Sequence, residues 1–241
     1  MKGESCAFTH NGRRSQNEDY YLADDLHGIY VLADGMGGYK GGEVACRIAV
    51  STCHDYIKKH LGSPIDIDDL MNFIRHKLKE EIQDHPEYAS MGTTLCCLYI
   101  QEGYIHAIHI GDSKIIIVAD SVYESRDHTY AQQLIDSCLL RADEYQHHPM
   151  RHILTRCLTG DAKEKFKADY CKIPLKQGRN TFLLCSDGVM EANSAAQTIH
   201  WLKDEPDIHK ILHTVEQNAL KYSKDNSTAI MVGLNYAVNG N

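Results

Sequence analysis

Residues 31–45 read VLADGMGGYKGGEVA, an apolar run followed by an acidic residue and a glycine-rich turn. The run begins at Gly28 (GIYVLA) and is rich in β-branched and apolar residues, so it is expected to form a buried strand. The turn extends from Asp34 to Gly42, and beyond it apolar residues recur at helical spacing to about residue 60. A strand, a turn that carries a carboxylate and a helix are therefore predicted to set the fold.

The remaining sequence alternates helical and β-rich patterns, without repeats or low-complexity segments. Residues 93–101, 104–110 and 114–119 are β-rich runs separated by turn residues, so they are expected to form an antiparallel meander. The other expected elements are an amphipathic helix at 67–82, mixed helix and loop at 130–160, a strand at 181–185, a helix near 208–222 and a strand near 228–234. This order predicts one α+β domain in which helices pack on sheets.

Composition excludes several classes of protein. The 241 residues carry a net charge of −8, from 33 acidic and 25 basic residues, which disfavours nucleic acid as the main partner. The longest apolar runs, such as Ile115 to Ala119, are far shorter than the roughly 20 residues that span a bilayer. We therefore expect no membrane segment and, since the N-terminus lacks an apolar stretch, no signal peptide.

Nine cysteines are present, an odd number, and no two have C-x-x-C spacing. A disulfide framework is typical of small secreted chains, whereas several of these cysteines lie in apolar runs. We expect reduced, mostly buried thiols and a cytoplasmic location. None of the cysteines lies in a C-x5-R phosphate loop, and the glycine-rich turn lacks the Gly-Lys-Ser/Thr ending of a nucleotide-binding P-loop.

Three aspartates lie at the edges of apolar strands. Asp34 and Asp187 each end an expected strand, and Asp225 opens the last one. Carboxylates that converge would repel one another unless a cation neutralised them, and Mg²⁺ and Mn²⁺ prefer such oxygen ligands. The alternative is that each is a turn or capping residue, for which aspartate is equally suited. The pattern alone leaves both interpretations open.

Eight motifs appear in order along almost the whole chain, from about residue 9 to 234. They are RRSQNEDYY (13–21), VLADGMGGYKGGEVA (31–45), MGTTLCCLYI (91–100), HIGDSKI (109–115), SRDHT (125–129), ILTRCLTG (153–160), LLCSDGV (183–189) and SKDNSTAIMV (223–232). Together they resemble the metal-dependent protein phosphatases of type 2C, in their compact bacterial form. One Asp-Gly pair would mean nothing, but this ordered set is specific.

The resemblance implies a binuclear Mn²⁺ or Mg²⁺ site. By analogy, Asp34 bridges two metal ions and the carbonyl of Gly35 binds one of them. Asp187 and Asp225 complete the shell of the other ion.

Three further roles follow from the same resemblance. Glu18 and Asp19 match an acidic pair near the second ion, with Asp19 as the closer contact. Asp112 matches the position that holds a third, weaker ion together with Asp187. Arg14 matches the arginine that grips the substrate phosphate, where its planar fork suits paired oxygens.

The family fold would be a four-layer sandwich: two central antiparallel β-sheets flanked by α-helices on both sides. Residues 1–241 would form a single type 2C catalytic domain, with a variable flap segment at about 129–150. The implied activity is hydrolysis of phosphoserine and phosphothreonine by a metal-bridging hydroxide. The implied partners are phosphorylated proteins, among them a bacterial Ser/Thr kinase and its substrates, and the protein would act as a monomer.

An alternative function is a catalytically silent phosphoprotein-binding module. It predicts the loss of at least one metal aspartate, and none is lost.

Two positions depart from the family pattern. Met36 stands where animal relatives carry a histidine proposed as general acid, and methionine cannot donate a proton. Lys114 replaces an arginine, which keeps the charge but loses the bidentate geometry. His147, His148 and His152 cluster in the sequence, but type 2C chemistry uses oxygen ligands, so we interpret them as surface or loop residues.

Overall fold

The computed structural model describes residues 3–36, 41–160 and 167–237. Its strands are β1 (Gly3–His10), β2 (Asp19–Asp24), β3 (Ile29–Met36), β4 (Gly92–Thr93), β5 (Leu95–Gln101), β6 (Tyr104–Ile110), β7 (Lys114–Val118), β8 (Val122–Glu124), β9 (Leu158–Thr159), β10 (Asp169–Pro174), β11 (Gly178–Cys185) and β12 (Ser227–Tyr236). Its helices are α1 (Gly42–His60), α2 (Ile67–Asp84), α3 (Tyr130–Asp136), α4 (Asp187–Ala192), α5 (Ala195–Asp204) and α6 (Ile208–Tyr222), with short 3-10 turns η1 (Pro86–Tyr88) and η2 (Ala142–His147).

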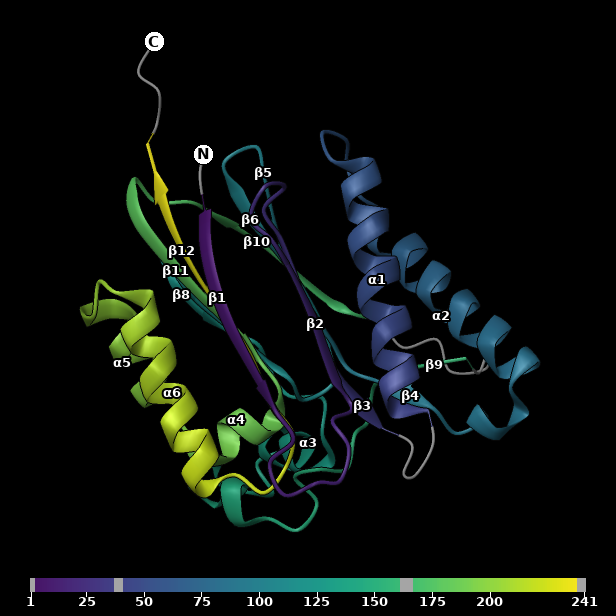
Figure 1. Cartoon of the computed structure of the whole chain (residues 1–241). Helices are drawn as coiled ribbons and strands as arrows, with labels where there is room; N and C mark the ends of the chain where they lie inside the picture. Colours follow the sequence, from purple (N-terminus) through teal and green to yellow (C-terminus); the bar gives the residue numbers. More distant parts are fainter. Residues whose placement is uncertain (1–2, 37–40, 161–166, 238–241) are drawn as a thin grey trace.

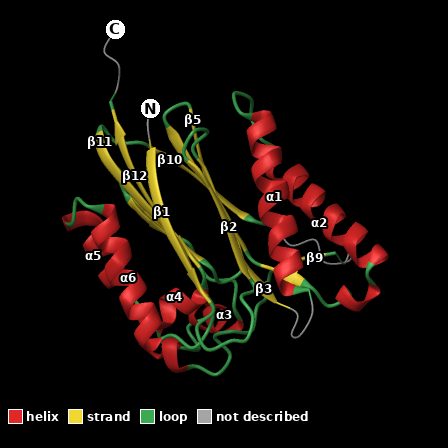
Figure 2. Ribbon diagram, in the orientation of Figure 1, coloured by secondary structure: helices red, strands yellow, loops and turns green. Residues whose placement is uncertain are grey.

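Two antiparallel sheets lie face to face between two layers of helices (Figures 1 and 2). Among the described residues, one sheet has the order β1-β12-β11-β7-β8, and the other has the order β10-β6-β5-β3-β4-β9, with β2 paired to β3. Helices α1 and α2 cover one outer face, and α5 and α6 cover the other. The predicted four-layer α+β sandwich is confirmed.

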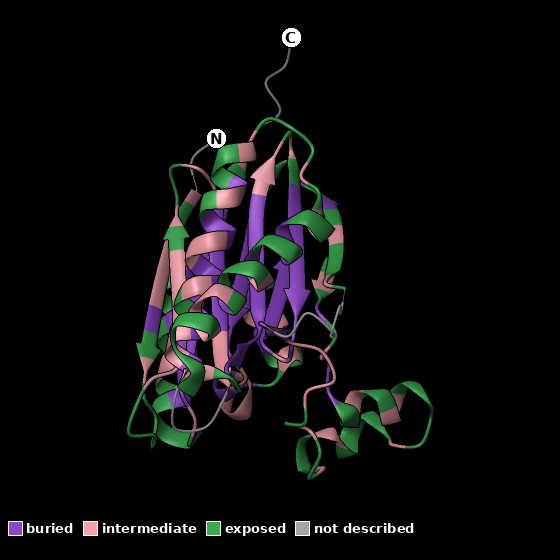
Figure 3. Ribbon diagram, turned by 90° about the vertical axis from the view of Figure 1, so that its right-hand side faces the viewer, coloured by how far each residue is buried: buried purple, intermediate pink, exposed green. Residues whose placement is uncertain are grey.

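The apolar core has three layers that follow from the strand alternation. Tyr30 and Leu32 of β3 point between the sheets with Phe182 and Ile230, all fully buried. Their neighbour Val31 points the other way and packs beneath the helices. Successive side chains of a strand face opposite sides, so a strand with helices on one face and a sheet on the other is apolar throughout. The central strands are accordingly almost entirely buried, while the helices expose their outer faces and edge strands such as β1 and β10 are partly exposed (Figure 3).

The predicted helices are confirmed at nearly the expected bounds. Helix α2 begins where the Asp66 carboxylate accepts a hydrogen bond from the backbone N–H of Asp69, an N-cap that the sequence places just before the apolar stripe. Helix α6 is capped in the same way by Asp207 and buries Ile211, Val215 and Ala219 on one face.

The meander predicted for residues 93–119 is wrong in its last strand. Strands β5 and β6 form the expected hairpin, but β7 belongs to the other sheet, where it lies between β11 and β8. All five β7 residues are buried, because this central strand has the opposite sheet on one face and helices on the other. The turn Gly111–Ser113 therefore crosses between the sheets and carries Asp112 with it.

Two strand boundaries also differ from expectation. Strand β3 continues through Asp34 to Met36, and β12 begins at Ser227, so Asp225 lies in the loop before it. Part of the glycine-rich turn, residues 37–40, lies outside the described residues. Within the described ranges, all helices are too short or too polar to cross a membrane.

Replacing Ile230 by alanine tests the layer between the sheets. Because Ile230 is fully buried there, we expect Ile230→Ala to lower the free energy of unfolding by about 2–5 kcal/mol in urea titrations. The control, Leu220→Ala, removes a side chain that is 55% exposed on α6 and should change stability by less than about 0.5 kcal/mol. Equal losses in the two variants would contradict the inter-sheet position of Ile230.

Candidate metal centre

The acidic site begins with two aspartates on neighbouring strands. The antiparallel register of β2 and β3 makes Asp19 and Asp34 direct partners across the ladder. Asp19 is buried and Asp34 is half-buried. Like charges directly opposite each other destabilise a sheet, so this pairing needs a compensating partner.

Asp19 has an oxygen that the protein leaves without a hydrogen bond. The Ser186 hydroxyl donates to its Oδ2 atom at 2.8 Å, whereas Oδ1 is buried and has no partner among the described residues. Burial raises the pKa of Asp19 to about 7, although the hydroxyls of Thr228 and Ser186 act in the opposite direction. Buried polar atoms are almost always satisfied, so the free oxygen fits a hard cation.

Burial and neighbouring carboxylates also destabilise the charged forms of Asp34 and Asp112. Burial, followed by the charges of Asp19 and Asp187, raises the pKa of Asp34 well above its usual value. Burial, followed by the charges of Asp187 and Asp127, raises the pKa of Asp112. Carboxylates this close cannot all ionise without a cation between them.

Two glycines allow the backbones to approach closely enough to form this cluster. A Cβ atom on Gly35 would lie 2.5 Å from the backbone of Gly42 at the start of α1 and 2.8 Å from the carbonyl of Glu18. Gly111 has φ +109°, and a Cβ there would lie 2.5 Å from the Thr94 side chain. Any other residue at either position would push the acidic turn away from its neighbours.

Asp187 and Asp225 reach the cluster from the other sheet. Asp187 is the first residue of α4, directly after β11, and Asp225 lies two residues before β12. The backbone of Ser186 hydrogen bonds to that of Thr228, which places the two segments side by side. Asn226 joins this sheet to the N-terminal segment by accepting a hydrogen bond from the Glu18 N–H and donating to the carbonyls of Asn11 and Gln16.

The acidic residues converge on one cleft of about 1060 Å³. It is lined by Arg14, Glu18, Asp34, Gly35, Met36, Asp112, His152, Asp187, Glu191 and Asp225, with other residues from the same segments. Asp19 lies directly behind this wall, hydrogen bonded to Ser186. The structure thus brings together the residues that the sequence suggested as metal ligands, from five separate parts of the chain.

Comparison with known proteins matches this geometry to a family. The family described as protein phosphatase 2C matches residues 8–227. The chain belongs to the protein phosphatase 2C family.

Curated relatives are bacterial phosphatases. The chain is 26% identical to the serine/threonine protein phosphatase PstP of Mycobacterium tuberculosis, over 91% of this chain but only 42% of that protein. It is also 26% identical to the serine/threonine phosphatase Stp of Listeria innocua, over 96% of both chains. The protein phosphatase PhpP of Streptococcus pneumoniae is 29% identical over 77% of this chain and 78% of that one.

Solved structures share the fold. The M. tuberculosis phosphatase PstP/Ppp superposes with a TM-score of 0.86 at 26% identity, over 98% of this chain and 100% of that chain. The PstP catalytic domain in complex with two manganese ions has a TM-score of 0.83 at 24% identity, over 98% and 99% of the two chains.

Arg14 lies on the cleft, but its fork faces a carboxylate. Its Nε and one terminal nitrogen donate to the two oxygens of Asp225, at 2.9 and 2.6 Å. The side chain is 62% exposed, so it can turn towards a ligand in the cleft. The phosphate-binding role that the type 2C resemblance implies for Arg14 stays a prediction.

His152 is a cleft residue that sequence reasoning did not identify. The expectation of a surface histidine is correct, but its Nδ1 atom lies 3.3 Å from Oδ2 of Asp187. Its place in a run of three clustered histidines offered a weak signal, which we discounted because type 2C metal ligands are oxygen atoms.

Lys114 is a structural cation in this phosphatase 2C chain. It is buried, donates to the carbonyl of Ser125 at 3.0 Å and forms an ion pair with Asp127. Burial lowers the pKa of Lys114, but the charge of Asp127, its hydrogen bond and the charge of Glu124 together outweigh burial, and the net shift is upward. A single compact ammonium suffices here, which explains how lysine can replace the family arginine.

A second acidic and histidine cluster lies apart from the cleft residues. His109, His128 and Asp169 present ligand atoms within 4.8 Å of one another. However, the N–H of Gly111 donates to Nδ1 of His128, and Arg156 donates to Asp169 at 3.0 Å. A cation at this point would face the Arg156 charge, so we interpret the cluster as a partly buried network of hydrogen bonds and ion pairs.

The raised pKa of Asp19 makes a pH prediction for the metal-free protein. Between about pH 4 and pH 7 the folded chain keeps the Asp19 proton while the unfolded chain releases it, so this residue lowers stability as pH rises. In chelator, we expect Asp19→Asn to be more stable than the parent, by an amount that grows from near zero at about pH 4 to about 1–4 kcal/mol at about pH 7.5.

The difference between the two proteins must be measured, because His109 titrates in the opposite sense. Burial lowers the pKa of His109 to about 3, so its contribution to stability increases with pH in both proteins and cancels in the difference. Urea titrations across this pH range give the difference, with Asp120→Asn on the exposed surface as the control. If the stability that Asp19→Asn gains over the parent protein did not vary with pH, the raised pKa of Asp19 would be contradicted.

Proposed function

We propose that this chain is a protein serine/threonine phosphatase that hydrolyses phosphoserine and phosphothreonine with bound Mn²⁺ or Mg²⁺. The observation that carries this proposal is the convergence of four aspartates on one cleft, with Asp19 behind them and one of its buried carboxylate oxygens without a partner among the described residues. Membership of the phosphatase 2C family supports it. The chain spans 42% of the length of the M. tuberculosis relative. The phosphatase activity is therefore proposed from the geometry of the cleft in this chain.

The ligand set fits two hard cations and a third, weaker one. Asp34 would bridge two ions, with the Gly35 carbonyl and Asp19 on one side. Asp187 and Asp225 would complete the other side. Asp112 would hold the third ion together with Asp187. Bound Mn²⁺ or Mg²⁺ supplies charge neutralisation and lowers the pKa of a coordinated water, which makes it a nucleophile near neutral pH.

The protein's own residues orient the substrate. Arg14 would turn from Asp225 to the phosphate oxygens, for which its planar fork is suited. Met36 lines the cleft and offers no proton to the leaving group. That proton would come from water or from another residue.

The wider setting follows from the chemistry. The substrates are phosphorylated proteins, and the phosphatase would oppose a Ser/Thr kinase. We infer that residues 1–241 act as one catalytic domain and as a monomer, with the flap segment (129–150) beside the cleft. None of the nine cysteines, which all lie in the described part of the chain, forms a disulfide, and this supports a reducing compartment such as the cytoplasm.

A silent phosphoprotein-binding module is the other candidate. It would need no cation at the site and would tolerate the loss of a ligand. The enzyme is favoured by the Asp19 oxygen that has no partner among the described residues and by the raised pKa values of Asp34 and Asp112. In a module without metal, the repulsion among these carboxylates would lower stability without any compensating interaction.

Hydrolysis of an aryl phosphate and a phosphothreonine peptide with Mn²⁺ tests the proposal. Because charge stabilisation by the metals contributes several kcal/mol, we expect Asp187→Ala to lower turnover by more than about 100-fold. The matched control, Asp120→Ala, removes an exposed carboxylate and should retain full turnover. Absence of Mn²⁺-dependent turnover, or full activity in Asp187→Ala, would refute the phosphatase function.

Arg14→Ala tests phosphate binding separately from metal binding. Loss of a charged hydrogen bond predicts a decrease in kcat/KM of about 10- to 100-fold, with Arg14→Lys intermediate. Arg13→Ala is the control, since it removes the same charge from the neighbouring exposed residue. Calorimetric titration with Mn²⁺ should show that Arg14→Ala still binds metal. If Arg13→Ala were equally impaired, the role assigned to Arg14 would be wrong.

A further inference from the structure

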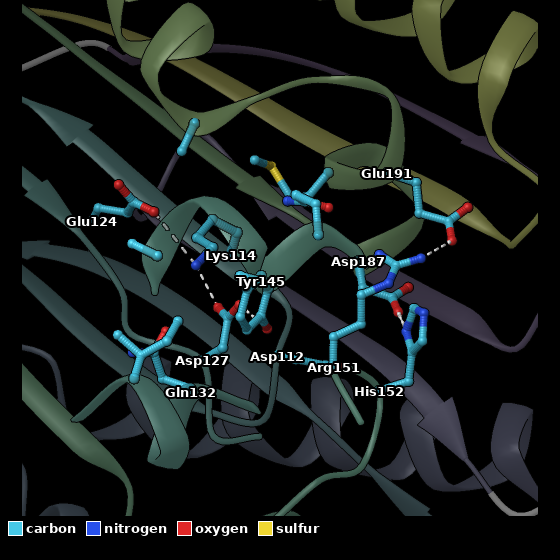
Figure 4. Close-up of a pocket in the computed structure, with 15 residues that line it drawn as sticks. Asp112, Lys114, Glu124, Asp127, Gln132, Tyr145, Arg151, His152, Asp187 and Glu191 are labelled. Atoms are coloured by element: carbon cyan, nitrogen blue, oxygen red, sulfur yellow. Dashed lines mark hydrogen bonds and ion pairs between the residues drawn. The ribbon is translucent and has the colours of Figure 1, made fainter. Parts of the chain in front are cut away.

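A second cavity, of about 240 Å³, adjoins the metal cleft (Figure 4). The two share Asp112, His152, Asp187 and Glu191 as lining residues, so they are direct neighbours. The remaining walls come from β7, β8, the flap segment and the start of α5. A water molecule occupies about 30 Å³ in the liquid, so the cavity has room for an amino-acid side chain.

One wall of this second cavity is a network of charged and polar side chains that already bond to one another. Lys114 lies between Asp127 and Glu124 (Figure 4). The Tyr145 hydroxyl donates to Oδ2 of Asp127 at 2.7 Å, while Lys114 donates to Oδ1. Both Asp127 oxygens are thus occupied and the side chain is only 11% exposed. Asp127 shapes the pocket and attaches the flap segment to β7, but it has little capacity left for a ligand.

On the opposite wall of the cavity, the charged side chains are also paired. Arg151 donates to Glu191 at 3.2 Å, and the backbone N–H of Lys224 donates to the other oxygen of Glu191. Arg151 and Glu191 are 24% and 19% exposed. This pair joins the end of the flap segment to α4 and leaves no net charge on that side.

The pocket nevertheless keeps an excess of negative charge. Asp112 and Asp187 belong to the proposed metal shell, and His152 contacts Asp187, so these three are set aside. The other charged lining residues are three carboxylates and two cations: Glu124, Asp127, Glu191, Lys114 and Arg151. Lys114 forms an ion pair with Asp127, and Arg151 forms one with Glu191. The negative charge that remains unbalanced is therefore that of Glu124. It lies 3.5 Å from Lys114 and is 40% exposed.

We propose that this pocket receives a lysine or arginine side chain of the phosphoprotein, close in sequence to the phosphorylated residue, and that Glu124 is its ion-pair partner. This inference rests on the proposed phosphatase function and adds a substrate preference to it. A long side chain with a charged end suits a pocket whose unbalanced charge lies at Glu124 and whose lining also includes the apolar side chains of Ile135 and Met190. Glu124 would act in substrate selection and not in the chemical step.

The test is a set of phosphothreonine peptides that differ at one flanking position at a time, with arginine, glutamine or glutamate. We expect arginine at one position to raise kcat/KM over glutamine by about three- to tenfold, mainly through a lower KM, as a partly exposed ion pair permits. Glutamate at that position should lower kcat/KM. An aryl phosphate, which has no flanking residues, provides the reference rate for each variant.

Charge changes at Glu124 make the test specific. Glu124→Gln should reduce kcat/KM for the arginine peptide to that of the glutamine peptide, and Glu124→Lys should reverse the preference towards glutamate. Asp120→Asn is the matched control, because it removes an exposed carboxylate that does not line the pocket and should keep the arginine preference.

Each outcome decides the question. Equal rates for arginine and glutamine at all positions, with Mn²⁺-dependent turnover intact, would overturn the pocket assignment and leave the phosphatase function standing. Loss of the preference in Asp120→Asn as well would show a long-range charge effect and overturn it too. No Mn²⁺-dependent turnover of any peptide or of the aryl phosphate would refute the phosphatase function and, with it, this inference.

Discussion

The pairing of β2 with β3 is the constraint on which the rest of the site depends. It holds Asp19 opposite Asp34 in a fixed antiparallel register, although like charges in that arrangement oppose folding. The repulsion between the two carboxylates occurs where the sheet ends but the backbone is still rigid. Because neither carboxylate can move away without breaking the ladder, the pair defines a position of strong negative potential. Every other acidic residue of the site is arranged around that position.

The two sheets contribute to the site in different ways. The sheet of β2 and β3 supplies the fixed pair, while the other sheet supplies Asp187 and Asp225 from the segments next to β11 and β12. Asp112 lies in the turn that crosses from one sheet to the other. The geometry of the cluster therefore depends on how the two sheets pack. Glycine also permits a close approach within one half of the site: a Cβ on Gly188 would lie 2.0 Å from the carbonyl of Asn226, so α4 could not approach the loop before β12 with any larger residue.

The sequence predicted the helices and most central strands because their apolar periodicity is local. It could place Asp34, Asp187 and Asp225 next to strands, but it could not bring them together, since convergence depends on pairings between distant segments. The ordered family motifs supplied that step. The meander failed for the same reason, because β7 follows β6 closely in sequence yet pairs with β11. Edge strands such as β1 and β10 mix exposed and buried positions and gave no clear pattern.

Two charged residues near the cleft act through pairings that the sequence motifs do not reveal. Glu124 belongs to no motif, and Lys114 looked like a simple loss of bidentate geometry. Their importance appears only when each charge near the cleft is matched with its partner. In the cleft, four half-buried carboxylates surround the buried Asp19, so a metal ion is the suitable partner. In the adjoining pocket, Lys114 and Arg151 already neutralise the buried carboxylates, and the remaining charge lies on a partly exposed side chain. A partly exposed charge is weakly attractive and easily released, and such a charge suits a substrate that must bind and leave in every catalytic cycle.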